Sequence, residues 1–509
     1  MRLSKERLIQ KIKQALKQVG TSQMSQSPYD LGWLLRLPAG RHGLPDSKNP
    51  RKPRYPQIIF WLEKLQHKDG SWGGQIPFAH DRVISTLSVI AGLSHWPLNE
   101  KWRGRIAKAA KAVELYSKKL LKEPEATVAF ELLFLKLLKE VENSGYAVNI
   151  PSKILKHYQN LQKQKLDKLP IAAAMKYPTT LLHALEALDE NKIDLRKFEK
   201  FQSSGGSFGC SPATTAFMLL RGVGGKKAEQ YLNGLVKKGI VPVLWPMEIF
   251  ERAWCLFPLF VLEINRYFTK QTAPHLKYLR QKWTKNGISL GKDFLVPDLD
   301  DTVIAFYLLN MSGVLIDSDF LKYFSTPGGL ICYPGERSGS FGSHYVNFLF
   351  ALPFLNHNDD YSADTIADFL KASAKDGYWD DKWHISPFYA SCRFALALSR
   401  DQTQSAALTK IVRRIIKAKK KNNLWGSGGQ GTVEETAYAL ISLLKQINIK
   451  NNFNDTIKKG FESLNQSANV RGDYPEMWVG KSLFAPANIV KIAIFSALLF
   501  YEENKSSFR

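Results

Sequence analysis

Apolar residues recur every three or four positions along most of this chain. In residues 3–19 the spacing of Leu8, Ile12 and Leu16 is that of a helix with one buried face. The same pattern continues in residues 58–65 and 303–309, whereas the strict alternation of β-strands is nearly absent. The pattern predicts an all-α protein.

Short turns in which glycine precedes an aromatic residue separate the helical segments, as at residues 70–72, 205–208 and 376–379. In the second half of the chain, the aromatic residues of successive turns are 46, 46 and 49 residues apart: Tyr333, Trp379, Trp425 and Tyr474. A repeat of this length is typical of stacked helical hairpins. Closing such hairpins into a ring gives a double-layered α/α barrel.

The composition agrees with a large folded protein. The chain has 509 residues, of which 44% are hydrophobic and 12% aromatic, so we expect two or more domains with sizeable cores. No run of about 18 apolar residues is free of charge, and no apolar segment follows the basic N-terminus. We therefore expect a cytoplasmic protein without a transmembrane helix.

The four cysteines form no CxxC pair, so neither a zinc site nor a disulfide framework is expected. The formal net charge is +25, but the lysines are spread along helices and do not form the stripe that nucleic acid requires. A basic surface also suits a diphosphate substrate or peripheral contact with an anionic membrane, and it equally describes an ordinary lysine-rich surface.

Three carboxylates precede an apolar run at Asp298, Asp300 and Asp301. Pro297 favours an extended backbone before them, and Asp301 and Thr302 are expected to cap the helix that follows. If this segment is buried, the three groups cannot all ionise, and at least one keeps its proton. The cluster is thus either a poised Brønsted acid or an acidic cap or cation-binding turn.

Asp298-Leu299-Asp300-Asp301-Thr302 resembles the DxDD motif of class II terpene cyclases. The stretch Gln66…Asp69-Gly70-Ser71-Trp72 resembles their QW repeat. Further blocks are similar to bacterial class II diterpene cyclases of the copalyl or halimadienyl diphosphate synthase type: 27–33, 128–132, 247–254, 381–389, 434–438 and 478–483. The resemblance covers nearly the whole chain.

The resemblance implies two α/α barrels in a βγ arrangement. Residues 1–22 and 270–509 would form the β domain, residues 23–269 an inserted γ domain, and the active site would lie between them. No class I domain is expected, because Asp359-Asp360…Asp364 has the wrong spacing for a DDxxD motif and is predicted to be a solvated loop.

By the same resemblance, Asp300 protonates the substrate while Asp298 and Asp301 hold its orientation and proton. Aromatic residues would line a pocket that stabilises carbocations, although each could equally be plain core: Trp283, Phe306, Tyr307, Trp379 and Tyr389. His344 and Asn347 could hold the water that takes the final proton, or could be ordinary helix caps.

The family anchors the substrate diphosphate through Mg²⁺ at an acidic stretch. Here Asp81 and Arg82 are kept, but His80 replaces an acid and is a poor ligand for magnesium. We therefore expect Asp81 to hold the metal weakly, with Arg82, Lys382 and Lys481 as further phosphate contacts. Either lysine could equally be solvated.

The predicted activity is cyclisation of geranylgeranyl diphosphate to a bicyclic labdane-, halimane- or clerodane-type diphosphate. A downstream class I synthase or phosphatase would then remove the retained diphosphate. Two alternatives are a farnesyl diphosphate cyclase that makes a drimane skeleton and a non-catalytic α-toroid that binds a partner. A protein prenyltransferase subunit is not expected, since the sequence offers no convincing Asp/Cys/His zinc set.

Overall fold

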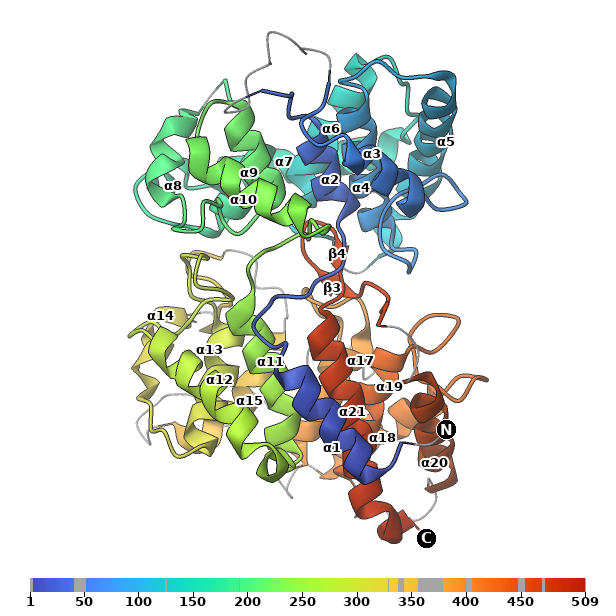
Figure 1. Ribbon diagram of the computed structural model, residues 1–509, viewed down its shortest axis with the longest axis vertical. Coiled ribbons are helices and arrows are strands. Elements are labelled where there is room, and N and C mark those ends of the chain that lie inside the picture. Colours follow the sequence, from blue (N-terminus) through green and yellow to red (C-terminus); the bar gives the residue numbers. More distant parts are fainter. Residues whose placement is uncertain are drawn as a thin grey trace.

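The computed structural model describes residues 3–40, 52–123, 126–191, 193–327, 329–336, 343–355, 379–399, 405–446, 454–468 and 472–508. Nearly all regular structure in these ranges is helical, and the strands form two short antiparallel pairs. The predicted all-α fold is therefore confirmed. The helices form an upper and a lower body along the long axis of the molecule (Figure 1).

The upper body contains α2 to α10. Its helices are α2 (Pro28–Leu35), α3 (Gln57–Leu65), α4 (Ala79–Leu93), α5 (Glu100–Ser117), η1 (Leu120–Lys122), α6 (Phe130–Asn143), α7 (Ser152–Lys168), α8 (Ile171–Ala174), η2 (Thr180–His183), η3 (Leu185–Ala187), η4 (Leu195–Phe201), α9 (Pro212–Leu220) and α10 (Gly225–Lys237). Five of these elements each contact the next one in the order α2, α4, α6, η3 and α9, and α9 contacts α2 again. They form a closed inner ring.

The lower body contains α1 and the elements after α10. Its helices are α1 (Lys5–Leu16), α11 (Glu248–Val261), η5 (Asn265–Tyr267), α12 (Thr269–Lys282), α13 (Leu299–Met311), η6 (Ser318–Phe320), α14 (Leu321–Phe324), α15 (Ser343–Ala351), η7 (Leu352–Phe354), α17 (Pro387–Leu398), α18 (Ser405–Lys417), α19 (Val433–Leu444), α20 (Asn454–Ser467), α21 (Ala487–Asn504) and η10 (Lys505–Phe508). Its strands are β1 (Ser325–Thr326), β2 (Gly329–Leu330), β3 (Trp478–Val479) and β4 (Leu483–Phe484).

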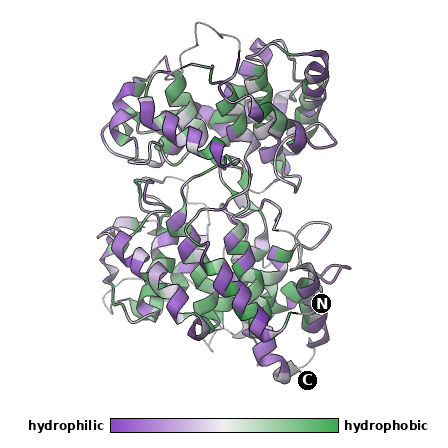
Figure 2. Cartoon of the chain, viewed as in Figure 1, coloured by the Kyte–Doolittle hydropathy of each residue, from purple (hydrophilic) through white to green (hydrophobic). Residues whose placement is uncertain are grey.

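A second closed ring organises the lower body. Helices α11, α13, α15, α17, α19 and α21 contact one another in this order, and α21 returns to α11. Helices α1, α12, α18 and α20 pack outside them. The ring helices are apolar on most sides, as a helix enclosed by others must be. Hydrophobic segments accordingly lie inside both bodies (Figure 2).

The hydrophobic residues form one core for each body, and the cores separate between Val241 and Val243. Helix α11 packs with α13 and α21 in the lower body. The domain boundary expected at residue 269 therefore lies too late in the chain, because the apolar face of α11 is buried in the lower ring.

The predicted glycine–aromatic turns use one set of contacts repeatedly. The indole N–H of Trp72 donates to the Leu62 carbonyl (2.7 Å), and that of Trp425 donates to the Ile415 carbonyl (2.6 Å). Each backbone N–H of these tryptophans also bonds a threonine hydroxyl on the next helix. The turns thus tie an outer helix to an inner one. Residues 376–378 of the third predicted turn lie outside the described residues.

The β3–β4 hairpin lies between the two bodies (Figure 1). Lys481 at its tip is fully buried, forms an ion pair with Glu186, and donates to the His183 carbonyl (2.9 Å) and to Ser211 Oγ (2.6 Å). The lower body is therefore anchored in the core of the upper one through a buried charge. Within the described ranges, no helix combines the length and apolarity needed to cross a membrane.

Replacing Lys481 with Met should lower the free energy of unfolding by about 3–5 kcal/mol, because Glu186 is then a buried charge without its cation. The second substitution Glu186→Gln in the same chain should recover much of that loss. Denaturant unfolding followed by circular dichroism measures both. The control is Lys445→Met, which removes an exposed ion pair with Glu263 and should cost at most about 1 kcal/mol. A loss no larger than this control would contradict the anchoring role.

Candidate active site

The acidic motif lies at the start of α13, in the inner ring of the lower body. Asp298 is the N-cap residue, with an extended backbone, and its Oδ1 accepts the backbone N–H of Asp301 (2.8 Å). The helix therefore begins at Leu299, earlier than the cap expected at Asp301 and Thr302. All three carboxyl groups are buried, with exposed fractions of 2%, 6% and 4% for Asp298, Asp300 and Asp301.

Asp298 and Asp301 behave as a pair. Their side chains share a hydrogen bond, and Asp298 Oδ2 and Asp301 Oδ1 have no donor from any other described group. Burial raises the pKa of Asp298 to about 7, and burial together with the charge of Asp298 raises the pKa of Asp301 far above its ordinary value. Because both pKa values are raised in this way, the pair keeps a proton at neutral pH.

Asp300 has a separate and asymmetric set of partners. Its Oδ1 accepts from the amide of Asn347 (2.7 Å) and from the Ser343 hydroxyl (3.3 Å). Among the described residues, the hydrogen-bond partner of its Oδ2 is the Cys332 thiol, at 3.7 Å from Sγ. Because a thiol is a weak hydrogen-bonding group, a proton on Oδ2 has no strong acceptor to hold it. This arrangement suits a carboxylic acid that gives its proton away.

Burial raises the pKa of Asp300, while the Asn347 hydrogen bond and the charges of Lys382 and Arg393 oppose that rise. Lys382 itself is largely buried, with 11% of its side chain exposed, and is ion-paired to Glu336 (2.5 Å). Glu336 also accepts the backbone N–H of Cys332 (3.0 Å), so one carboxylate holds both the cation and the thiol loop beside the acid. Burial thus favours the protonated form of Asp300, and its donors and the nearby cations stabilise the anion left after proton transfer.

The water-holding role of His344 and Asn347 stays a prediction, and His344 Nδ1 has no hydrogen-bond partner among the described residues. The Asn347 amide is engaged at both ends, since its oxygen accepts from Arg393 (2.8 Å) while its nitrogen donates to Asp300. His344 hydrogen-bonds the Leu330 backbone, and burial lowers its pKa well below the ordinary value. Asn347 is thus a direct partner of the acid, and His344 is a neutral buried imidazole in the first turn of α15.

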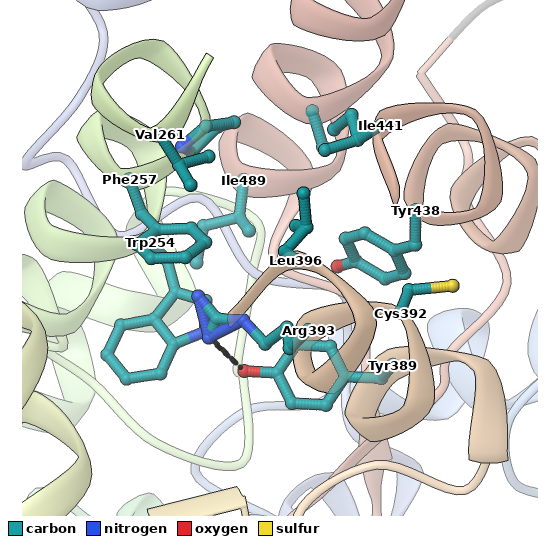
Figure 3. A pocket seen from close by; sticks show the side chains of 12 residues that line it. Trp254, Phe257, Val261, Tyr389, Cys392, Arg393, Leu396, Tyr438, Ile441 and Ile489 are labelled. Atoms are coloured by element: carbon teal, nitrogen blue, oxygen red, sulfur yellow. Dashed lines mark hydrogen bonds between the residues drawn. The ribbon is translucent and has the colours of Figure 1, made fainter. Parts of the chain in front are cut away.

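An apolar pocket opens inside the lower ring beside these groups (Figure 3). It is lined by side chains of α11, α17, α19 and α21: Trp254, Phe257, Pro258, Val261, Tyr389, Cys392, Arg393, Leu396, Tyr438, Ile441, Ile489 and Ala493. The Tyr389 hydroxyl accepts from the Trp254 indole (2.7 Å) and from Arg393 (2.9 Å). One polar corner therefore adjoins a cavity of aromatic and aliphatic groups.

Of the five aromatic residues predicted to line the pocket, Tyr389 is the one that lines this cavity. Tyr307 is buried against Phe257 and Phe350, one layer behind the wall. Trp379 packs edge-on against Phe394 (4.5 Å). Trp283 and Phe306 pack together and against Phe320 (5.6 Å from the Trp283 ring). For these four residues the contacts are those of core side chains.

The acid faces the junction of the two bodies. Asp381 Oδ1 accepts the backbone N–H of Ser343 (3.0 Å), whose hydroxyl donates to Asp300. Asp381 also lines a small pocket together with Phe78 and Ala126 of the upper body. A chain of two hydrogen bonds therefore links Asp300 to a small pocket that both bodies line, and the active site between the bodies stays a prediction.

The expected magnesium site does not fit its residues. Asp81 Oδ2 accepts the Gly74 N–H (2.6 Å), and Oδ1 accepts the Leu483 N–H (3.0 Å) and Ser85 Oγ (3.2 Å). His80 is bonded through Nδ1 to Glu123 (2.7 Å) and through Nε2 to Tyr158 (2.8 Å). The three donors tie the 70–75 turn and β4 to the fully buried Asp81 carboxyl, which accounts for its contacts by a role in the fold.

The predicted phosphate contacts also have other partners. Arg82 is buried and donates to Ser71 Oγ (2.7 Å) and the Gln75 carbonyl (3.3 Å). Lys481 is the anchor described above, which contradicts a substrate-binding role because its charge is neutralised inside the upper core. Lys382 is ion-paired to Glu336 and its charge acts on Asp300, and its contact with phosphate stays a prediction.

The fold brings together an Asp/Cys/His set that the sequence did not reveal. One potential ligand atom from each of Asp300, Cys332 and His344 lies within 4.8 Å of the others. Asp300 Oδ1 already accepts two donors, and the charge of Lys382 acts on all three residues. A buried ammonium opposes a metal cation at this place, so we regard the set as the surroundings of the acid.

Four residues around the acid were not predicted from the sequence to belong to the site: Arg393, Ser343, Glu336 and Cys332. For Arg393 a signal was present, since it is the single charge within the apolar run 387–398 that forms α17. A charge at such a position must be enclosed by polar partners. The other three lie far from the motif in sequence, and nothing in their local pattern indicates a site.

Comparison with known proteins places these features in context. No family model matches the chain. It is 32% identical over 391 residues to bifunctional levopimaradiene synthase of Picea sitchensis, covering 75% of this chain and 44% of that protein. It is 31% identical over 436 residues to copalyl diphosphate synthase 2 of Selaginella moellendorffii, covering 82% and 56%. The chain thus spans about half the length of the curated relatives it matches.

Solved structures share the fold over nearly the whole chain. The ent-copalyl diphosphate synthase of Streptomyces platensis matches with a TM-score of 0.76 at 24% identity, covering 97% of this chain and 99% of that one. Abietadiene synthase of Abies grandis matches with a TM-score of 0.68 at 25% identity, covering 99% and 59%. By relationship in sequence and by fold, the chain belongs to the family of class II diterpene cyclases.

Proposed function

We propose that this protein cyclises geranylgeranyl diphosphate to a bicyclic diterpenyl diphosphate, with Asp300 as the initiating acid. The observation that carries the proposal is the asymmetry of Asp300: two donors bind Oδ1, whereas within the described part of the chain Oδ2 meets a thiol. Support comes also from the relatives, which include copalyl diphosphate synthases. An Arabidopsis thaliana structure of this fold contains an aza analogue of geranylgeranyl thiolodiphosphate.

In the first step the Oδ2–H bond of Asp300 breaks, and a C–H bond forms at the terminal alkene of the substrate. The positive charge moves to the tertiary carbon, and the remaining anion is stabilised by Asn347 and Ser343. Successive alkenes then close two rings, and a final C–H bond releases a proton. The C–O bond to the diphosphate remains intact.

The pocket beside the acid supplies the surroundings for the cationic intermediates. Trp254, Phe257 and Tyr438 present aromatic groups to the cavity, and the other lining side chains are mainly aliphatic. Ring faces attract cations, and an apolar lining excludes the water that would trap them. No step of this proposal uses a metal held by Asp81.

Purified protein incubated with geranylgeranyl diphosphate should yield a bicyclic alcohol after dephosphorylation, as measured by gas chromatography and mass spectrometry. Asp300→Asn should reduce turnover by on the order of 10²–10⁴-fold, because an amide of the same shape cannot supply the proton. The matched control is Asp319→Asn, an exposed carboxylate of the same body, which should retain full activity.

Only linear alcohol from folded wild-type protein would contradict the proposal. A bicyclic product from farnesyl diphosphate alone would assign the site to the shorter substrate. Equal activity in Asp300→Asn and Asp319→Asn would remove Asp300 from the role of the acid.

Asp301→Asn should lower kcat by less than Asp300→Asn while leaving KM nearly unchanged. The substitution removes the carboxyl that shares a proton with Asp298, but leaves the partners of Asp300 in place. Steady-state kinetics on both variants tests this order. A loss for Asp301→Asn greater than that for Asp300→Asn would shift the role of the acid to Asp301.

A further inference from the structure

Arg393 occupies an unusual position for a charged side chain. It is 5% exposed, it lines the apolar pocket, and its guanidinium lies 4.1 Å from the centre of the Phe257 ring. One of its nitrogens donates to Tyr389 (2.9 Å) and to the Asn347 amide oxygen (2.8 Å). Burying a guanidinium costs free energy, and its position in the pocket wall points to a role for Arg393 in the reaction.

The contacts of Arg393 decide which way the Asn347 amide points. A guanidinium has only donors, so the atom of Asn347 that faces it must be the oxygen. The NH₂ group then faces Asp300 and donates to Oδ1. With Oδ1 accepting from the amide and from Ser343, the carboxyl proton is left on Oδ2.

The opposite orientation of the amide would disable the acid. The amide oxygen would then face Asp300, and the carboxyl group would donate its proton to that oxygen. A proton held in a strong hydrogen bond to an amide is not free to attack an alkene. In the first orientation the carboxyl proton of Asp300 is therefore available to the substrate, and in the second it is held by the amide oxygen.

We propose that Arg393 is a positioning residue that locks the Asn347 amide and so places the transferable proton on Oδ2 of Asp300. Arg393 is itself held, since Tyr389 accepts from it and also accepts from the Trp254 indole. The lock thus runs from the pocket wall to the acid through hydrogen bonds of 2.7–2.9 Å. This inference rests on the proposed function.

The charge of Arg393 also acts on Asp300 directly, because it opposes the rise in the pKa of that carboxyl. A direct charge effect and a lock through Asn347 make different predictions. When the Asn347 amide is removed, the direct charge effect of Arg393 on Asp300 persists, whereas any effect that acts through the orientation of that amide disappears. A double-mutant cycle separates them.

Arg393→Met should lower kcat about tenfold or more with little change in KM, and Arg393→Lys should recover part of that loss because an ammonium also only donates. Asn347→Ala should lower kcat as well. In the Asn347→Ala background, Arg393→Met should cause little further loss. Arg36→Met is the matched control, since Arg36 is equally buried and lies over Trp33 in the upper body.

Additive losses in the cycle, or an Arg36→Met loss in kcat equal to that of Arg393→Met, would overturn the lock while leaving the cyclase function intact. A second readout needs no turnover. Infrared difference spectra against Asp300→Asn isolate the carbonyl stretch of the protonated carboxyl. That band should move to lower frequency in Arg393→Met, because the proton then bonds the amide oxygen. An unchanged band would overturn the lock.

Discussion

Burial of three carboxyl groups at the start of one helix is the constraint on which the rest of the site depends. Water cannot solvate these groups, so their charge must be limited by retained protons and balanced by donors. Asp298 and Asp301 meet the requirement by sharing a proton. Asp300 meets it with an amide and a hydroxyl donor on Oδ1 and a weak thiol contact on Oδ2, which leaves Oδ2 as the acidic oxygen.

The two helical rings supply the surroundings that this arrangement needs. The inner helices of the lower body are packed on all sides, and they hold Asp300 on α13, Asn347 on α15 and Arg393 on α17 in fixed relation. The upper body covers the end of the ring that carries the acid. Lys481, buried in the upper core, keeps the β3–β4 hairpin between the bodies in place.

The fold class followed from the helical spacing of apolar residues and from the repeated glycine–aromatic turns. The acid motif followed from its carboxylate spacing and from the blocks that resemble class II cyclases. The domain boundary was wrong because the apolar pattern of α11 does not say which of two cores receives it. The substrate-binding role predicted for Lys481 was wrong for a related reason, since only the folded chain shows which donors and acceptors already occupy a side chain.

The partners of Asp300 could not be predicted in the same way. Asn347, Ser343 and Cys332 reach it from loops and helices more than 30 residues away, and their pairing is set by how neighbouring helices close the ring. Arg393 carried a usable sequence signal as a lone charge in an apolar helix. Its link to Asp300 was not evident from the sequence, because it runs through two successive hydrogen bonds, from the guanidinium to Asn347 and from Asn347 to the acid.

The central claim is that an exchangeable carboxyl proton of this chain starts the cyclisation. Turnover of geranylgeranyl diphosphate in D₂O, with the product analysed by mass spectrometry and deuterium NMR, tests it most directly. We expect a bicyclic product with one deuterium, located on the ring CH₂ next to the gem-dimethyl carbon, because the proton adds to the CH carbon of the terminal alkene and the charge forms on the neighbouring tertiary carbon. A bicyclic product without deuterium at that position would show that another event initiates the reaction.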